Sequence, residues 1–360
     1  MSTDPSKVGE CTWEIRELAR RYPPVWQNEN KGTVSRIVGD DKQTPGSITV
    51  SRWKADNVLP STIVGNVDAT IRVVPHRGFF PCANNPPNDD SDSTVHWYMN
   101  FADTIVFGHG EGPLLAQAEL QIVEHPILCS IGKALQARDD GGLRNLTREN
   151  GVATPILVQG VPRRCRLLTD RYQIYGDHFA QASEDTIEKA VERTTDIIVR
   201  SNIVAISAVA PSYGMYTVTQ ITHMLETAYA GFRACVLTST ESSNNDDDDD
   251  GNGRDVSIHT GHWGCGAYGG NKGLVTAIQI MAAGMAGVRT LHFWYGHTAA
   301  DQTALQHGME VASLLDGTPT LRAVRLLDSA GYAWGVANEN HVPYEPPRSC
   351  LLSRSIQEEE

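Results

Sequence analysis

The sequence predicts an α/β protein, and three observations support this fold class. Short apolar segments rich in β-branched residues alternate with segments of helical periodicity, which is typical of helices packed on both faces of a mostly parallel or mixed sheet. The chain has 360 residues, enough for two domains or one large α/β domain. Hydrophobic residues make up 40% and charged residues 20%, which excludes a disordered or fibrous protein.

The expected elements can be placed in order along the chain. Residues 1–94 are rich in Pro, Asn and Asp, and we expect an irregular accessory region with a helix at 13–21 and short strands at 47–50 and 69–74. Further strands are expected where short apolar runs occur, at 156–160, 197–209, 233–239, 256–260 and 288–295. Helices are expected at 114–124, 183–193, 217–229, 272–285 and 303–314. In the helix at 272–285, an apolar stripe recurs every three or four residues, at Leu274, Ile278, Met281 and Met285.

Two polar segments are expected to be surface loops. Residues 81–93 combine prolines with aspartates, and residues 244–255 include five adjacent aspartates that repel one another. We therefore expect an accessory region at 1–94 that packs on a core at 95–345, followed by a polar acidic tail at 346–360.

Charge and composition restrict the function. The net charge of −13 argues against a broad surface for the nucleic-acid backbone but allows a small anionic ligand. The seven cysteines form no Cys-x-x-Cys pair and the twelve histidines no His-x-x-x-His pair, so we expect neither a disulfide framework nor a metal site. No run approaches the roughly 20 apolar residues of a membrane span, and we expect a soluble protein of the cytoplasm or nucleus.

A glycine-rich run at 259–270 lies between an expected strand and an expected helix. Its glycines allow the backbone to turn and to approach a ligand closely, and the start of the helix attracts an anion, so a phosphate is the expected ligand. The run is neither a Walker loop nor a Rossmann motif, and a plain glycine-rich connection is the structural alternative. Trp263 and Tyr268 are candidates to pack on a ribose or a base.

A second glycine-rich segment, 100–120, leads into the helix that contains Gln117 and Glu119. An acid at the start of a helix is favoured by the helix dipole, so Glu119 can be a capping carboxylate. Alternatively, it is a partly desolvated acid that points into a cleft and serves as an acid and base.

Together the two segments resemble the poly(ADP-ribose) glycohydrolase family of macrodomains. The first family motif, Phe-Ala-Asn-x-x-x-Gly-Gly-Gly-x-x-Gly-x-Gly-x-x-Gln-Glu-Glu, aligns without a gap with Phe101, Ala102, Gly108, Gly112, Gln117 and Glu119. The second, Thr-Gly-Asn-Trp-Gly-Cys-Gly-Ala-Phe-Gly-Gly, matches residues 260–270 at nine of eleven positions. Residues 203–206 and 228–232 resemble further family segments, so the resemblance covers roughly residues 95–300.

The resemblance implies a macrodomain-like three-layer α/β/α sandwich with a mixed sheet. It also implies an ADP-ribosyl glycohydrolase that acts on ADP-ribosylated proteins without a cofactor. Glu119 would be the catalytic acid, assisted by Asp103. The residues expected to bind the ADP-ribose are Phe101, Gly108, Gly110, Glu111, Gly112, Gln117, His262, Gly264, Cys265, Gly266, Ala267 and Tyr268.

The sequence departs from the first family motif at several positions. Ala118 replaces the first glutamate, Asp103 replaces the asparagine, and Phe107 and His109 interrupt the triple glycine. The departures leave two functions open. One is a hydrolase for polymeric or single, arginine-linked ADP-ribose, and the other is a macrodomain that binds ADP-ribose without cleaving it. A nicotinamide-dependent dehydrogenase is the least favoured alternative.

Three further side chains bear on the site. Cys265 lacks a surrounding Cys–His–Asn pattern and is not expected to be a nucleophile. Tyr172 and Tyr175 are candidates to cover an adenine ring, with core packing or exposure as the alternative.

Overall fold

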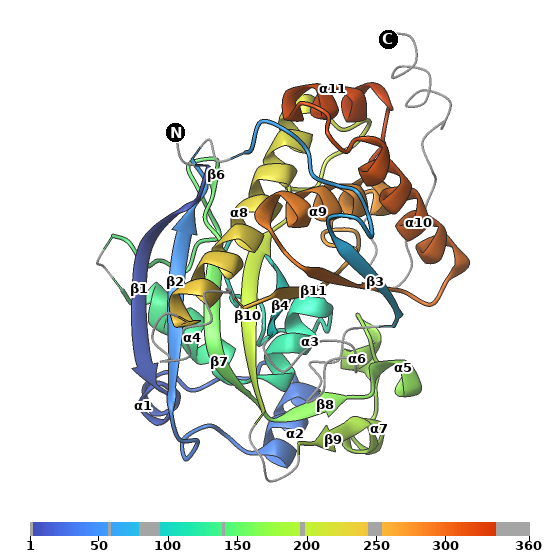
Figure 1. The fold of residues 1–360 in the computed structure, drawn as a ribbon. Helices are drawn as coiled ribbons and strands as arrows, with labels where there is room; N and C mark the ends of the chain where they lie inside the picture. The colour runs from blue at the N-terminus through green and yellow to red at the C-terminus, as the bar shows by residue number, and fades with distance from the viewer. Residues whose placement is uncertain are drawn as a thin grey trace.

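The structure is a computed structural model that describes residues 3–56, 59–78, 94–138, 141–194, 199–243 and 254–335 (Figure 1). Within these residues, eight strands form the central sheet in the order β1-β2-β7-β10-β4-β11-β12-β3. Their bounds are β1 (Ser6–Glu14), β2 (Ser47–Lys54), β3 (Arg72–Arg77), β4 (Val95–Ala102), β7 (Ile156–Arg163), β10 (Val199–Ser207), β11 (Val256–Gly261) and β12 (Thr290–Tyr295). Two small ribbons pair β5 (Arg148–Glu149) with β6 (Val152–Ala153) and β8 (Cys165–Leu167) with β9 (Val191–Arg193).

The sheet is mixed, as predicted. β10, β4, β11, β12 and β3 run parallel to one another, whereas the pairs β1–β2, β2–β7 and β7–β10 are antiparallel. β4 and β11 are adjacent, with His259 opposite Tyr98 in the register. Because parallel neighbours end at the same edge of a sheet, the loops that follow β4 and β11 emerge side by side.

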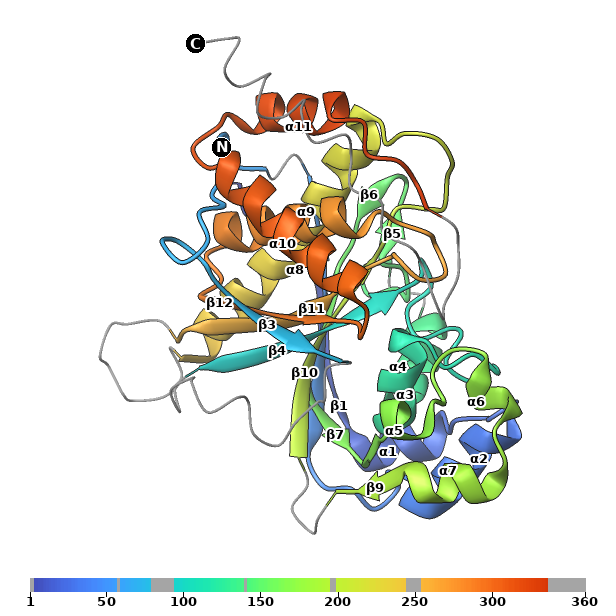
Figure 2. The same ribbon diagram turned by 90° about the vertical axis from the view of Figure 1, so that its right-hand side faces the viewer.

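Helices cover both faces of the sheet (Figure 2). On one side lie α8 (Val218–Ser243), α9 (Lys272–Ala286), α10 (Ala299–Leu314) and α11 (Thr320–Ser329). On the other side lie α1 (Ile15–Arg21), α2 (Glu29–Val38), α3 (Gln117–Glu124), α4 (Ile127–Gln136), α5 (Thr169–Tyr172), α6 (His178–Gln181) and α7 (Glu184–Ala190).

The side chains of β4 contribute to the hydrophobic cores on both faces of the sheet. Trp97 and Met99 are buried in the core under α8 and α9, whereas Tyr98 is buried in the core shared with α1 and α4. Successive side chains of a strand point to opposite faces, so each strand contributes to two cores. The α/β/α sandwich expected from the sequence is therefore the observed architecture.

The structure corrects several expected elements. The strand expected at 233–239 is wrong, because these residues continue α8, where Phe232 and Cys235 face the core. The helix expected at 183–193 ends at Ala190 and is followed by β9. The helix expected at 13–21 begins only at Ile15, since the preceding residues belong to β1.

The N-terminal region is also more regular than expected. It supplies β1, β2 and β3 to the central sheet, so the description of residues 1–94 as irregular is wrong. The division into accessory region, core and tail stays a prediction. The loops expected at 81–93 and, for the most part, at 244–255 lie outside the described residues, as does the tail at 346–360. Among the helices of the described residues, none combines the length and the apolar character needed to cross a membrane.

Candidate active site

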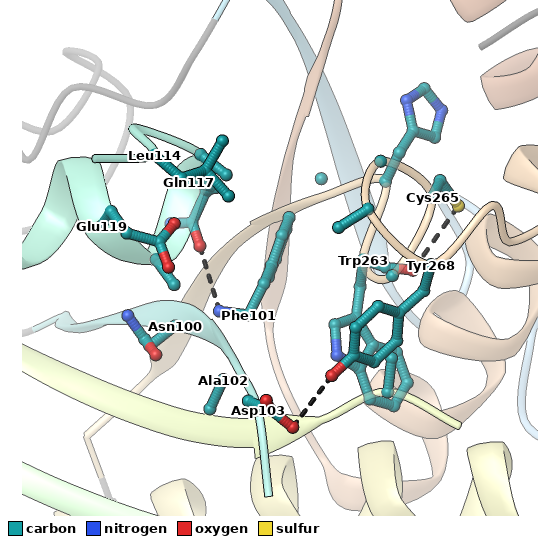
Figure 3. Close-up of a pocket in the computed structure, with 18 of the residues that line it drawn as sticks. Asn100, Phe101, Ala102, Asp103, Leu114, Gln117, Glu119, Trp263, Cys265 and Tyr268 are labelled. Atoms are coloured by element: carbon teal, nitrogen blue, oxygen red, sulfur yellow. Dashed lines mark hydrogen bonds between the residues drawn. The ribbon is translucent and has the colours of Figure 1, made fainter. Parts of the chain in front are cut away.

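A cavity of about 620 Å³ lies between the two loops that leave β4 and β11 (Figure 3). We call residues 103–116 loop 1 and residues 262–271 loop 2. The first residues of α3, Tyr175 and residues between Trp294 and Asp301 complete the wall. The volume is in the range of sites that enclose most of a small organic ligand.

Buried contacts of Phe107 and Gly110 fix the conformation of loop 1. Phe107, which occupies a glycine position of the family motif, has φ +57° and is buried in the core next to α4. This left-handed backbone costs a non-glycine residue about 1–2 kcal/mol, which burial of the ring offsets. Gly110 is packed so closely that a Cβ atom there would lie 2.7 Å from Ile122.

A buried lysine from α2 binds the same loop. Lys31 is fully buried, and its Nζ atom donates hydrogen bonds of 2.8 Å to the carbonyl oxygens of Gly110 and Leu114. Burial lowers the pKa of Lys31 to about 8, although the nearby Glu119 carboxylate opposes this shift. The N-terminal region thus fixes the loop that precedes the candidate acid.

Glu119 is the third residue of α3, and it lines the cavity with only 9% of its surface exposed. Burial raises the pKa of the Glu119 carboxyl. The amides at the start of the helix and the neighbouring Lys31 and His109 counteract this effect only in part. A raised pKa favours the protonated form of this carboxyl group, which is the form that a general acid needs.

Gln117 fixes the start of α3 against β4. Its Oε1 atom accepts a hydrogen bond from the Phe101 backbone N–H at 3.0 Å, and its Nε2 atom donates to the Met99 carbonyl oxygen at 3.2 Å. Both ends of the amide are used in this way, so Gln117 sets the position of the helix that carries Glu119. Figure 3 shows Phe101 lying between Glu119 and Asp103.

Loop 2 presents backbone N–H groups next to the cavity. Gly264 has φ +69°, and a Cβ atom there would lie 2.5 Å from the Ala208 Cβ atom, so only glycine fits. Within the described residues, no acceptor is found for the backbone N–H groups of Gly264, Gly266, Ala267 and Tyr268. Such amides in a glycine-rich turn are typical of an anion site.

The two loops are joined across the cavity. The Tyr268 hydroxyl in loop 2 donates a hydrogen bond of 2.9 Å to Oδ1 of Asp103 in loop 1 (Figure 3). The other carboxylate oxygen of Asp103 lies 3.1 Å from Nε2 of His109. Burial and the Asp103 carboxylate raise the pKa of Tyr268, so its hydroxyl remains a donor.

The structure brings nearly all predicted site residues to this cavity. Glu111 is the exception: its carboxylate accepts hydrogen bonds of 2.6 Å from Lys133 Nζ and from the Val25 backbone N–H, away from the cavity. Of the residues expected to bind the substrate, Glu111 therefore lies outside the cavity wall. The other predicted site residues all line the cavity: Phe101, Asp103, Gly108, Gly110, Gly112, Gln117, Glu119, His262, Gly264, Cys265, Gly266, Ala267 and Tyr268.

The remaining candidates from the sequence are Tyr172, Tyr175 and Cys265. Tyr175 lines the cavity, whereas Tyr172 packs against a separate core cluster that includes Ile187. Burial raises the pKa of the Cys265 thiol to about 12, so the thiol is neutral and a poor nucleophile, in line with the expectation from the sequence.

A buried ion pair in the cavity wall was missed by the sequence reasoning. Lys272 Nζ lies 2.5 Å from Asp301 Oδ1, and both side chains line the cavity. Although burial opposes it, the Lys272 ammonium and the Thr298 hydroxyl lower the pKa of Asp301. The sequence does carry a signal here, because Thr298 and Asp301 have the spacing of a capping box and form one at the start of α10.

The layered architecture and the paired glycine loops define an α/β sandwich with a candidate anion-binding site. The family model of poly(ADP-ribose) glycohydrolase, macro domain fold, matches residues 156–302. This match confirms the resemblance and the fold class predicted from the sequence. The matched segment includes loop 2 but not loop 1.

The solved structures that this chain resembles are more distant. The Deinococcus radiodurans poly(ADP-ribose) glycohydrolase in complex with ADP-ribose is 11% identical, with 84% of this chain and 94% of that chain covered and a TM-score of 0.38. The Thermomonospora curvata enzyme bound to the inhibitor ADP-HPD is 14% identical, with 84% and 83% covered and a TM-score of 0.35. The Oceanobacillus iheyensis macrodomain with bound MES is 11% identical, with 72% and 96% covered and a TM-score of 0.37. No curated protein matches this chain. Because these TM-scores are below 0.5, the family resemblance rests on the matched segment and the two loops.

Proposed function

We propose that this protein is an ADP-ribosyl glycohydrolase that releases ADP-ribose from modified proteins. The observation that carries the proposal is the position of Glu119, a desolvated acid in the wall of a cavity enclosed by two glycine-rich loops. The family match over residues 156–302 supports the same reaction class. A cytoplasmic or nuclear location stays a prediction.

Loop 2 is suited to hold the diphosphate of the substrate. The N–H groups of Gly264, Gly266 and Ala267 can donate to phosphate oxygens without competition from a protein acceptor within the described residues. Loop 1 would enclose the diphosphate from the other side. The distal ribose would then lie toward Glu119 and Asp103.

Glu119 would act first as an acid and then as a base. Breaking the bond between the anomeric carbon of the distal ribose and the leaving atom produces an oxocarbenium-like transition state. Protonated Glu119 would donate its proton to the leaving atom, which departs with the electron pair of the bond. Ionised Glu119 would then accept a proton from the water molecule that attacks the anomeric carbon. The Asp103 carboxylate can orient the ribose hydroxyls or pair with a leaving guanidinium.

The test uses three substrates: arginine-linked, glutamate-linked and polymeric ADP-ribose. The wild-type protein is expected to release ADP-ribose from at least one of them. Glu119→Gln is expected to lower kcat about 10²- to 10⁴-fold while the Kd for ADP-ribose changes little, because only proton transfer is lost. Glu188→Gln on the exposed side of α7 is the matched control, and it should leave both quantities unchanged.

A macrodomain that binds ADP-ribose without cleaving it is the second candidate. Ala118, at a glutamate position of the family motif, lines the cavity and favours this alternative, because it removes one potential acid from the wall. Tight binding of ADP-ribose without release from any of the three linkages would support it. Absence of ADP-ribose binding would contradict both candidates.

A further inference from the structure

Four histidines lie on one face of four neighbouring strands, close to the cavity but outside it. They are His76 on β3, His292 on β12, His259 on β11 and His96 on β4. His259 lies directly opposite His292 in the parallel register, and His96 lies one diagonal step away on β4. Sequence spacing could not reveal this group, because it is assembled by the order of the strands.

The ring nitrogens are close enough to share one ion. One nitrogen from each of His96, His259 and His292 lies within 4.8 Å of the others. The distance between His96 Nδ1 and His259 Nε2 is 3.0 Å. Two imidazole nitrogens bound to one tetrahedral ion at about 2.0–2.1 Å are roughly 3.4 Å apart, so side-chain shifts on the order of 1 Å suffice.

The surroundings hold the three rings in place. Tyr98 stacks on His259 with a centroid distance of 4.4 Å, and His259 stacks on His292 at 4.5 Å. His76 Nε2 lies 3.0 Å from His292 Nδ1, so it can orient His292 from outside. Ligating histidines are usually fixed by such a hydrogen bond to the second ring nitrogen.

The donor set selects the class of ion. Within the described residues the group consists of imidazoles only, without a carboxylate or thiolate. Imidazole favours Zn²⁺, Co²⁺, Ni²⁺ and Cu²⁺, whereas Mg²⁺ and Ca²⁺ require oxygen donors. His96 is partly exposed while His259 and His292 are 1% exposed, so an ion can enter at His96 and be held by the two buried rings.

We propose that His96, His259 and His292 form a binding site for one transition-metal ion of the zinc class, with His76 positioning His292. The ion would join β4, β11 and β12 beneath loop 2. Trp294 would connect the bound ion to the cavity, because its ring stacks on His76 with a centroid distance of 4.3 Å and also lines the cavity. The proposal departs from the expectation of no metal that was based on sequence spacing, and it does not depend on the proposed function.

The full-length protein is first stripped with a chelator and then titrated with Zn²⁺ by calorimetry and with Co²⁺ by absorption spectroscopy. We expect one Zn²⁺ per chain and the intense visible bands of a four- or five-coordinate Co²⁺ site with nitrogen ligands. His96→Gln should weaken Zn²⁺ binding by at least about tenfold. His178→Gln, which changes an exposed histidine on α6, is the control for surface binding and should have no effect.

His96 is the first position to change because it is the least buried of the three ligands, so this variant should fold. If it does not, Co²⁺ spectra of the wild-type protein and of His76→Gln decide the question. His76→Gln should bind Co²⁺ more weakly with a shifted spectrum. Three results would overturn the proposal. The protein could bind Zn²⁺ no more strongly than a surface histidine does, His96→Gln could leave Zn²⁺ binding unchanged, or the Co²⁺ spectrum could show the weak bands of an octahedral site.

Discussion

Gly264→Ala tests whether the shape of loop 2 depends on a missing side chain. At φ +69° an alanine would lie in the left-handed region, which costs about 1–2 kcal/mol. Its Cβ atom would also lie 2.5 Å from the Ala208 Cβ atom, and overpacking of this kind costs about 1–3 kcal/mol. We therefore expect the free energy of unfolding to fall by about 2–5 kcal/mol.

Gly287→Ala separates the two contributions. Gly287 has φ +81°, and a Cβ atom added there would meet no other atom within 4 Å, so this variant should lose only the backbone cost of about 1–2 kcal/mol. Both variants reduce the freedom of the unfolded chain in the same way, so the difference between them isolates the contact with Ala208. Combining Gly264→Ala with Ala208→Gly should recover about 1–3 kcal/mol.

The assay is urea unfolding of the four proteins, followed by calorimetry with ADP-ribose. Gly264→Ala should also weaken ADP-ribose binding, because displacement of loop 2 moves its N–H groups. Gly287→Ala should bind normally, since it lies at the far end of α9. Equal stability of the two single variants, or no recovery in the double variant, would refute the packing argument.

Three further predictions concern buried ionisable groups. Burial lowers the pKa of His125 to about 3. Below its unfolded pKa of about 6.5, the unfolded chain therefore binds a proton that the folded protein excludes, and stability falls by about 1.4 kcal/mol per pH unit. Urea unfolding at pH 6.5 and 5 should show this loss, and His125→Phe should reduce it. Lys31→Met removes a cation that lowers the pKa of Glu119, so the alkaline limb of the hydrolase pH profile should move to higher pH. The Glu124 carboxylate lies 3.0 Å from Arg163 and is almost fully buried, so Arg163→Met leaves it without its ion-pair partner. We expect the free energy of unfolding, measured by calorimetry, to fall by about 3–5 kcal/mol.

Each of these predictions has an outcome that would contradict it. An identical acid dependence in the wild-type protein and His125→Phe would show that another group is responsible. Lys133→Met, which breaks an ion pair on the outer side of loop 1, should leave the alkaline limb unchanged. If it shifts the limb as much as Lys31→Met does, proximity to Glu119 is not the cause. An additional Glu124→Leu change should restore part of the stability lost in Arg163→Met.

The sequence predicted the central elements well where patterning and burial agree. The strands that became β7, β11 and β12 were found because they are short apolar runs, and the helix that became α9 was found because its apolar residues recur every three or four positions. The strand expected at 233–239 was wrong. Its apolar part is only four residues long, from Ala234 to Leu237, and periodicity in so short a run does not separate a strand from a helix.

The candidate site was predictable only in part. Local motifs identified loop 1, loop 2 and Glu119, and the family resemblance indicated that they meet. The engagement of Glu111 with Lys133 depends on the position of α4, which no local motif encodes. The buried Lys31 comes from a region far away in the sequence, and the histidine group requires the order of the strands.

The two outermost strands, β1 and β3, both come from the first 77 residues, whereas the strands between them are mostly synthesised later. Arg72 of β3 pairs with Thr290 of β12, so this border of the sheet can close only after most of the polypeptide has left the ribosome. Such distant pairing raises the contact order and slows folding. A polypeptide starting at residue 95 would lack the strands that pair with the outer edges of β7 and β12. The unpaired backbone N–H and C=O groups at these edges would favour aggregation.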